Sequence, residues 1–161
     1  MSPLYETGGI ESVMKAIIQR VSQASVTVDG TVISAINRGY LILLGVGQGD
    51  EILDSQKLAD KIVHLRLFPN AEGKFDQSVI DISGEVMVVS QFTLLADCHK
   101  GRRPSFHLAA PPETAERLYL DFVSRLTNHG IKAVTGKFQA SMQVALVNDG
   151  PVTISLDSQH L

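Results

Sequence analysis

The stretch KAIIQRVSQASVTVDG, residues 15–30, decides the fold. Alternate residues of its first half point to opposite faces of an extended chain, and Asp29-Gly30 ends it with a dipeptide typical of a tight hairpin turn. Residues 32–36 continue the strand pattern, and the apolar run at 40–44 is typical of a strand in the centre of a sheet. The chain is therefore predicted to open with a β-meander.

Two amphipathic helices are predicted after the meander. The first covers residues 51–67, with apolar residues at three-and-four spacing and Asp50 as its N-cap. The second begins at Pro111-Pro112, carries an apolar stripe from Ala115 to Leu126, and stops before Gly130. The remaining predicted strands are 79–82, 85–95, 131–135, 142–147 and 152–156.

Strands outnumber helices and occur in runs, which is typical of the α+β class. We therefore expect a single domain over residues 14–161, with a mixed or antiparallel β-sheet and two main helices. Residues 1–13 contain Pro3, Gly8 and Gly9 without any period, and Met14 directly precedes the first strand. These thirteen residues are predicted to be a leader, disordered or left over from expression, rather than an ordered arm.

Composition excludes several classes of protein. The single cysteine cannot form an internal disulfide, which favours a reducing compartment, and we expect a cytoplasmic location. The net charge of −3 argues against a broad basic face for long nucleic acids, although contact with one RNA end is compatible with it. No apolar stretch is long enough to span a membrane, so a membrane is not expected as a partner. DNA is not expected either, because of the net charge.

Three motifs carry candidate chemistry. Ser90-Gln91-Phe92-Thr93 follows a very apolar strand and is a candidate pocket wall, although Ser and Thr are also ordinary strand residues. Asn148-Asp149-Gly150-Pro151 is either a plain turn or the site of a cis peptide bond. Lys100-Gly101-Arg102-Arg103 is either a solvated loop or a contact for a few phosphates at an RNA terminus.

Other chemistry is not favoured. The five histidines lack metal-ligand spacing, so neither a metal site nor a cofactor is expected. Cys98 and His99 are unsuited to act as nucleophile and base, because adjacent side chains on an extended backbone point apart. Residues 45–49 lack the final glycine of a dinucleotide-binding loop, and a turn is expected there.

Taken together, these stretches resemble the D-aminoacyl-tRNA deacylase family over about residues 14–157. The combination of Ser-Gln-Phe-Thr with Asn-x-Gly-Pro at this separation is highly specific, whereas either motif alone is weak. The residues that carry the resemblance are Ile17–Val21, Ala24–Val28, Ser90–Leu94 with Ala96-Asp97, Arg103–Phe106, Met142–Val144 and Leu146–Thr153.

The resemblance implies a homodimer that hydrolyses the ester between a D-amino acid and the terminal adenosine of tRNA. Its partner would be a tRNA acceptor end that carries a D-amino acid or glycine. It implies a catalytic group of Ser90, Gln91, Phe92 and Thr93. It implies a substrate-binding group of Phe138, Met142, Asn148 and Arg103, with the first two on the adenosine side.

The resemblance also implies how chirality is read. In the family the Gly-Pro bond, here Gly150-Pro151, is cis and enters the partner subunit's site, where its carbonyls exclude L-amino acids. The strand arginine, here Arg20, braces that turn.

Two mechanisms are compatible with these residues. Thr93 could act as a covalent nucleophile, or the substrate's 2′-hydroxyl could activate water while backbone N–H groups near Phe92 and Thr93 hold the oxyanion. We favour the second, because no base accompanies the motif. The rival functions are a non-catalytic module that binds the tRNA acceptor end, and a Cys98-dependent hydrolase of small esters, which thiol alkylation would inactivate.

Overall fold

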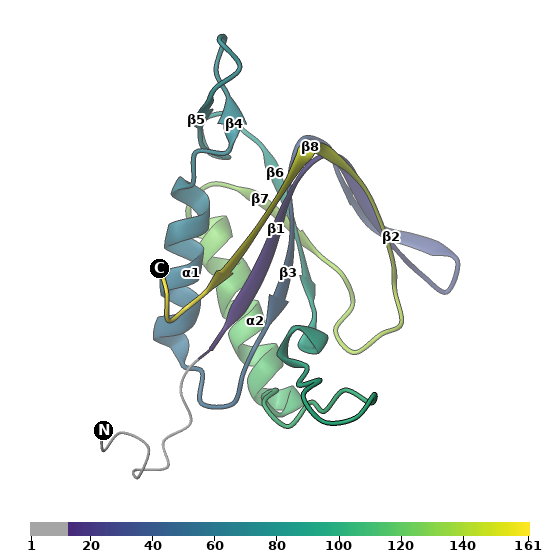
Figure 1. Ribbon diagram of the computed structural model, residues 1–161. Helices are drawn as coiled ribbons and strands as arrows, with labels where there is room; N and C mark the ends of the chain where they lie inside the picture. The colour runs from purple at the N-terminus through teal and green to yellow at the C-terminus, as the bar shows by residue number, and fades with distance from the viewer. Residues whose placement is uncertain (1–12) are drawn as a thin grey trace, which may run out of the picture.

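The computed structural model describes residues 13–161, so the leader predicted for residues 1–13 lies outside the described residues, except for Val13. Two α-helices, eight strands and a short 3₁₀ helix follow one another in this part of the chain (Figure 1). Their bounds are β1 Lys15–Val28, β2 Thr31–Ile36, β3 Gly39–Gly45, α1 Ile52–His64, β4 Phe68–Pro69, β5 Phe75–Gln77, β6 Glu85–Ser90, η2 Phe92–Leu95, α2 Pro112–Asn128, β7 Lys132–Thr135 and β8 Gln143–Asp157.

Six strands form one mixed sheet in the order β2-β1-β3-β6-β7, with β8 paired to β1. β3 and β6 are parallel, as are β6 and β7, because the chain crosses between each pair through a helix. β1 pairs antiparallel with β2, β3 and β8. The predicted β-meander is therefore wrong, because the long strand β1 lies between β2 and β3 and pairs with both. The predicted fold class, α+β with a mixed sheet and two main helices, is confirmed.

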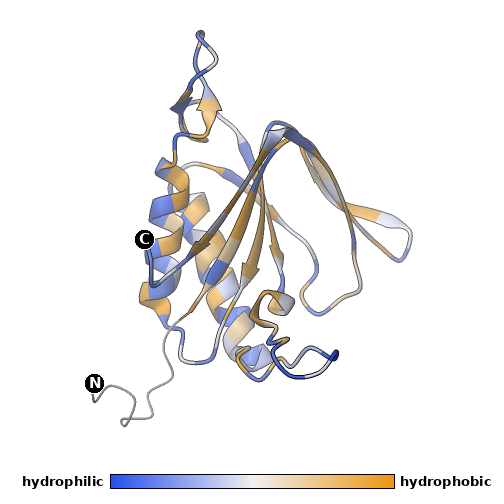
Figure 2. Ribbon diagram, in the orientation of Figure 1, coloured by the Kyte–Doolittle hydropathy of each residue, from blue (hydrophilic) through white to orange (hydrophobic). Residues whose placement is uncertain are grey.

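Both helices cover one face of the sheet, where they pack side by side (Figure 1). Ile18, Ile42 and Val88 come from three strands of that face and are fully buried against helix residues such as Ile62 and Phe122. Figure 2 shows hydrophobic residues along the strands and on the sides of the helices that face them. This main core explains the three-and-four spacing seen in both helices.

A second, smaller core lies on the opposite face of the sheet. The far half of β1, together with β2 and the first half of β8, curls over this face and buries Val26, Leu41 and Met87. Met142 and Val144 are partly buried at its edge. That edge also forms one wall of the cavity at the carboxyl ends of the parallel strands.

Two predicted strands are wrong, the first entirely and the second in part. Residues 79–82 form a turn, because Ser78 and Asp81 each accept a hydrogen bond from the other's backbone N–H, at 2.9 and 3.1 Å. The strand predicted over 85–95 ends at Ser90, and the chain continues as η2. The change of direction at Ser90 creates a rim instead of extending the sheet.

The first helix differs from its prediction at both ends. Its N-cap is Glu51, which forms a reciprocal capping box with Asp54, and the helix ends at His64, three residues before the predicted limit of 67. Asp50, the predicted cap, accepts other hydrogen bonds. Within residues 13–161 no helix is both long and apolar enough to cross a membrane.

Candidate functional site

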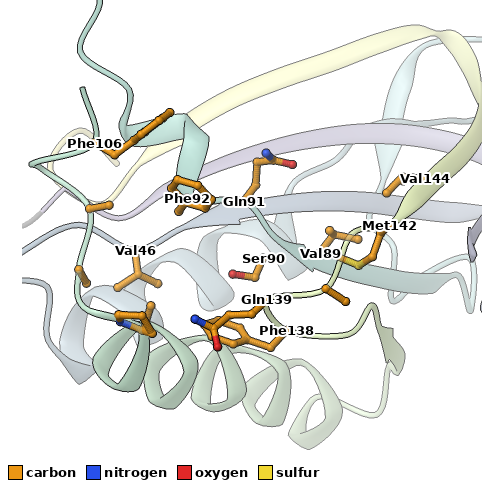
Figure 3. Close-up of a pocket in the computed structure, with 15 residues that line it drawn as sticks. Val46, Val89, Ser90, Gln91, Phe92, Phe106, Phe138, Gln139, Met142 and Val144 are labelled. Carbon is orange, nitrogen blue, oxygen red and sulfur yellow. The ribbon is translucent and has the colours of Figure 1, made fainter. Parts of the chain in front are cut away.

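A cavity of about 650 Å³ opens where the parallel strands end (Figure 3). Because β3, β6 and β7 run in the same direction, their carboxyl ends lie at the same edge of the sheet. The end of β6 brings Ser90 to the cavity wall, and the segments after β3 and β7 bring Val46 and Phe138. The other lining residues are mostly apolar: Val89, Gln91, Phe92, Phe106, Ala109, Ala110, Pro112, Ala115, Gln139, Ala140, Met142 and Val144.

The predicted catalytic motif lies at this cavity, with one exception. Ser90, Gln91 and Phe92 line it, whereas Thr93 lies beyond the lining. The side-chain amide of Gln91 donates a hydrogen bond to the Thr93 hydroxyl. Within residues 13–161 that hydroxyl bonds to no carboxylate or imidazole, so no base contacts it in this part of the chain.

Two backbone N–H groups at the start of η2 are free. Those of Phe92 and Thr93 make no hydrogen bond within residues 13–161, because no preceding turn of helix supplies an acceptor. The neighbouring N–H of Gln91 donates to the carbonyl of Leu44 at 2.8 Å, which fixes the motif to the end of β3. η2, which starts at the cavity edge, thus begins with two N–H groups that are unpaired within residues 13–161, on a backbone that is held in place at Gln91.

η2 rests directly on Gly45, the last residue of β3. A Cβ atom at Gly45 would lie 2.7 Å from a methyl carbon of Leu95 and 3.0 Å from the carbonyl oxygen of Gln91. Only glycine permits this close approach. Sequence analysis assigned no site role to Gly45, and a glycine at the end of an apolar run is the one signal that pointed to it.

Phe138 and Met142 lie together in the segment between β7 and β8. The Phe138 ring lies 6.0 Å from the Tyr119 ring of α2, and the Tyr119 hydroxyl donates to the carbonyl of Val88 at 3.0 Å. The Met142 sulfur accepts a hydrogen bond from the backbone N–H of Lys137 at 3.4 Å. Both predicted adenosine-side residues therefore belong to the same cavity as Ser90.

The turn that holds Gly150 and Pro151 lies within β8 and does not line the cavity. Where β8 pairs with β1, the four residues 149–152 lie opposite a single residue, Arg20. The turn therefore bulges out of the ladder. The Gly150-Pro151 peptide bond is cis, as expected, and both residues are exposed. Asn148 is also outside the cavity lining.

Arg20 contacts the turn as expected. Its side chain is buried, with Nε donating to the Asp149 carbonyl at 2.7 Å and Nη1 donating to the Leu67 carbonyl at 2.6 Å. The guanidinium carbon also lies 5.8 Å from the centre of the Phe75 ring. Arg20 thus ties the bulge of β8 to the β4–β5 hairpin.

Asn148, within β8, holds the turn through hydrogen bonds of its side-chain amide. Its side-chain oxygen accepts from the backbone N–H of Val152 at 2.7 Å. Its side-chain nitrogen donates to the Val152 carbonyl at 3.2 Å and to the Thr153 hydroxyl at 3.1 Å. The amide is therefore directed at the turn and not at the cavity.

Two of the lining residues without a predicted role have distinctive geometry. Phe106 lies just after the basic loop, and its ring meets the Phe92 ring edge to face at 4.9 Å. Gln139 lines the cavity with a φ of 63°, a conformation uncommon for a residue other than glycine. An aromatic residue directly after the basic loop was a weak sign that Phe106 has a role. Nothing in the sequence pointed to Gln139. Arg103 is exposed and outside the lining.

Asp50 links the start of β1 to the cavity wall. Its carboxylate accepts from the backbone N–H groups of Val13 and Gly47, each at 2.6 Å. Gly47 in turn pairs with Ala109, which lines the cavity. Burial raises the pKa of Asp50 to about 6, and this effect outweighs the two hydrogen bonds, which favour the charged form.

The side chains considered for other chemistry stand apart. Within residues 13–161 no group of three or more His, Cys, Asp or Glu residues could hold a metal ion. Cys98 is exposed, and the ring of the adjacent His99 lies 3.1 Å from the Asp97 carboxylate. His99 is thus engaged with a carboxylate and not with the thiol.

A family model and two related proteins each match most of this chain. A family model described as D-Tyr-tRNA(Tyr) deacylase matches residues 17–157. A D-aminoacyl-tRNA deacylase of Roseiflexus castenholzii is 61% identical over 145 residues, which cover 90% of this chain and 92% of that protein. One from Desulfitobacterium hafniense is 55% identical over 146 residues, covering 91% and 98%.

Two solved structures resemble the chain. One, described as c-Myc DNA Unwinding Element Binding Protein, superposes with a TM-score of 0.82 at 46% identity and covers 88% of this chain and 97% of its own. The other, described as a probable eukaryotic D-amino acid tRNA deacylase, has a TM-score of 0.78 at 15% identity and covers 90% and 99%. At that identity the second likeness shows the fold alone.

Proposed function

The chain belongs to the D-aminoacyl-tRNA deacylase family and is a hydrolase that removes D-amino acids from tRNA, and from this premise we propose where the ester binds and how it is cleaved. The ester carbonyl lies at the Ser90–Phe92 edge of the cavity, and the terminal adenosine lies against Phe138 and Met142. The observation that carries this assignment is that both groups line one cavity of about 650 Å³. That volume is within the usual range for small-molecule sites.

The proposed mechanism is assisted by the RNA. A water molecule, activated by the substrate's 2′-hydroxyl, attacks the ester carbonyl, and the resulting oxyanion accepts hydrogen bonds from the N–H groups of Phe92 and Thr93. The bond between the carbonyl carbon and the 3′ oxygen then breaks. The 3′ oxygen takes the proton that the attacking water gave up through the 2′-hydroxyl, and the free amino acid and tRNA leave. The free N–H groups and the lack of a base at Thr93 within residues 13–161 support this mechanism.

Single-turnover deacylation of D-Tyr-tRNA tests the mechanism. We expect Thr93→Ala to retain substantial activity, and Thr93→Ser serves as the matched variant that keeps the hydroxyl. A tRNA ending in 2′-deoxyadenosine should not be hydrolysed by any of the three proteins. An inactive Thr93→Ala that still binds substrate, combined with an active deoxy substrate, would establish Thr93 as the nucleophile.

The Gly150-Pro151 turn is proposed to complete the cavity of a second subunit in a homodimer. The turn is exposed, lies outside its own cavity, and is held by Arg20 and Asn148. A held but exposed turn suits a role as a rigid wall in trans. Asn148 then acts on the substrate through the turn that it clasps.

Mixed dimers test this arrangement. Sedimentation should report about twice the chain mass of 17.4 kDa. A Phe92→Ala chain and a Gly150→Val chain, each inactive or unselective alone, should recover part of the selective activity when mixed. Proven mixed dimers without any recovery would show that each subunit builds its own site.

Rejection of L-amino acids is proposed to act by exclusion. The amino group, the ester and the α-carbon are common to both enantiomers, so a wall can reject only the Cβ and the side-chain atoms beyond it. D-Tyr-, D-Phe- and D-Asp-tRNA should therefore react at comparable rates, Gly-tRNA should react measurably, and L-Ala-tRNA should not react. Equal resistance of Gly-tRNA and L-Ala-tRNA would refute exclusion by the turn.

Three expectations from the sequence stay predictions. Arg103 is proposed to bind substrate through its positive charge. We expect no binding to duplex DNA at physiological salt, because the net charge is −3, and fluorescence anisotropy checks it. The cytoplasmic location is open to test by cell fractionation.

A further inference from the structure

A positively charged loop stands beside the cavity. Two backbone hydrogen bonds close it at its base, from Asp97 N–H to the Ser105 carbonyl at 2.7 Å and from Ser105 N–H to the Asp97 carbonyl at 2.8 Å. Lys100, Arg102 and Arg103 lie within four positions of this loop, and all three are exposed. We call residues 97–105 the cationic loop.

The three cationic side chains of the loop have no partner in the part of the chain that the structure describes. Lys100, Arg102 and Arg103 make no hydrogen bond or ion pair within residues 13–161. The carboxylate of Asp97 is engaged by His99, whose backbone N–H donates to it at 3.0 Å, and that bond lowers the pKa of Asp97. In a chain of net charge −3, these three neighbouring cations form a concentrated positive patch.

The loop is also tied to the cavity rim. Directly after it, Phe106 lines the cavity and contacts the Phe92 ring. The backbone carbonyl of His107 accepts a hydrogen bond from the Gln48 side chain at 2.7 Å, on the segment after β3. Figure 1 shows this part of the chain projecting from the body of the molecule near η2 and the start of α2. Its position relative to the catalytic motif is therefore set by two separate anchors.

We infer that the cationic loop binds the phosphodiester backbone of the RNA acceptor strand whose last nucleotide occupies the cavity. The inference rests on the proposed function, which places the terminal adenosine inside and leaves the preceding phosphates at the rim. Each phosphate carries one negative charge, and arginine offers a planar pair of donors that matches phosphate oxygens. Cations that are unpaired within the described chain and held at the mouth of an apolar cavity provide the complementary charge.

A pair of substrates isolates this contact. D-Tyr-tRNA carries the acceptor-strand phosphates, whereas D-tyrosyl-adenosine carries the same ester and nucleoside with no phosphate. The loop variant is Lys100→Ser with Arg102→Ser, at exposed positions where little effect on folding is expected. The control is Lys57→Ser with Lys61→Ser, which removes the same charge from exposed positions of α1.

We expect the loop variant to raise the KM for D-Tyr-tRNA by about 10-fold or more at low salt, with kcat nearly unchanged. The slope of log(kcat/KM) against log salt should become shallower by about 1.4, since each lost phosphate contact on a single strand accounts for about 0.7. Hydrolysis of D-tyrosyl-adenosine should not change in either variant. The control should behave as the unaltered chain with both substrates.

Three results would overturn the inference. They are an unchanged KM for D-Tyr-tRNA in the loop variant, an equal loss in the control, and a parallel loss with D-tyrosyl-adenosine. An unaltered chain that hydrolyses neither substrate would refute the proposed function itself, and the inference with it.

Discussion

Replacing Arg20 by methionine should loosen the Gly150-Pro151 turn while leaving the cavity intact. The guanidinium donates to the carbonyls of Asp149 and Leu67, at 2.7 and 2.6 Å, and these bonds join the bulge of β8 to the β4–β5 hairpin. Methionine keeps an apolar stem of similar length but cannot donate a hydrogen bond. The variant therefore removes the brace with little loss of packing.

The magnitude can be worked from the two bonds. A hydrogen bond from a charged donor contributes about 1.5–3 kcal/mol, and because Asp149 is exposed, water can replace part of its bond, so the lower value applies. We expect Arg20→Met to lower the free energy of unfolding by about 3 kcal/mol. Arg20→Lys should lower it by about half as much, since a single ammonium cannot reproduce the fork of the guanidinium.

Urea denaturation measures the loss of stability, and deacylation of D-Ala-tRNA and of L-Ala-tRNA measures the loss of selectivity. The D-Ala-tRNA rate should stay within a few-fold of the unaltered chain, while L-Ala-tRNA hydrolysis should rise, more in Arg20→Met than in Arg20→Lys. Arg66→Met is the matched control, because Arg66 is an exposed partner of Asp76, and such surface pairs contribute little. If Arg20→Met keeps the normal urea midpoint and still rejects L-Ala-tRNA fully, Arg20 does not brace the turn.

Three further predictions concern the cavity and its supports. A Cβ at Gly136 would lie 2.5 Å from the Met142 sulfur, so Gly136→Ala should push the Met142 side chain into the cavity. We expect the KM for D-Tyr-tRNA to rise about fivefold, which steady-state measurement of kcat/KM checks. An unchanged KM would contradict this prediction. Gly45→Ala should press on Leu95, cost about 1–3 kcal/mol in urea denaturation and lower kcat, whereas a stable and fully active variant would contradict the close packing of η2. The folded pKa of Asp50, about 6, exceeds its ordinary 3.8, so the folded chain binds this proton more tightly than the unfolded chain does. The stability that this proton contributes is full below about pH 4 and is lost as the pH rises to about 6, a change of about 3 kcal/mol. Urea midpoints measured against pH should show this change in the unaltered chain and not in Asp50→Asn. Parallel pH profiles of the two proteins would refute the prediction.

Most of the fold could be predicted from local patterns. The three strands between Lys15 and Gly45 and both helices arise directly from period-2 and period-3.6 alternation, which short segments specify by themselves. The order of these strands in the sheet, β2-β1-β3, is not specified by that alternation, which is why the predicted meander is wrong. The strand predicted over 85–95 fails at Ser90 because Phe92, Leu94 and Leu95 are as apolar as strand residues. Their 3₁₀ conformation depends on contact with Gly45, which is distant in sequence.

The site could be predicted only where a motif is contiguous. Ser90, Gln91 and Phe92 stood out as polar and aromatic groups after a buried strand, and the structure places them at the cavity. By contrast, the bond from Arg20 to Asp149 spans 129 residues, and Gln139 reaches the cavity only through its unusual backbone conformation. Pairings over such distances leave no pattern in a single sequence.

β8 sets a fixed distance between the cavity and the bulge. Val144 lines the cavity and Gly150 lies in the exposed part of the bulge, so six residues of strand, about 20 Å, separate the two. Inserting or deleting one residue between them would reverse which side chains of β8 face inward, because the side-chain period of a strand is two. Anyone who engineers the protein should therefore treat this interval as closed to insertions and use the exposed tip between β4 and β5, at residues 71–74, for added sequence.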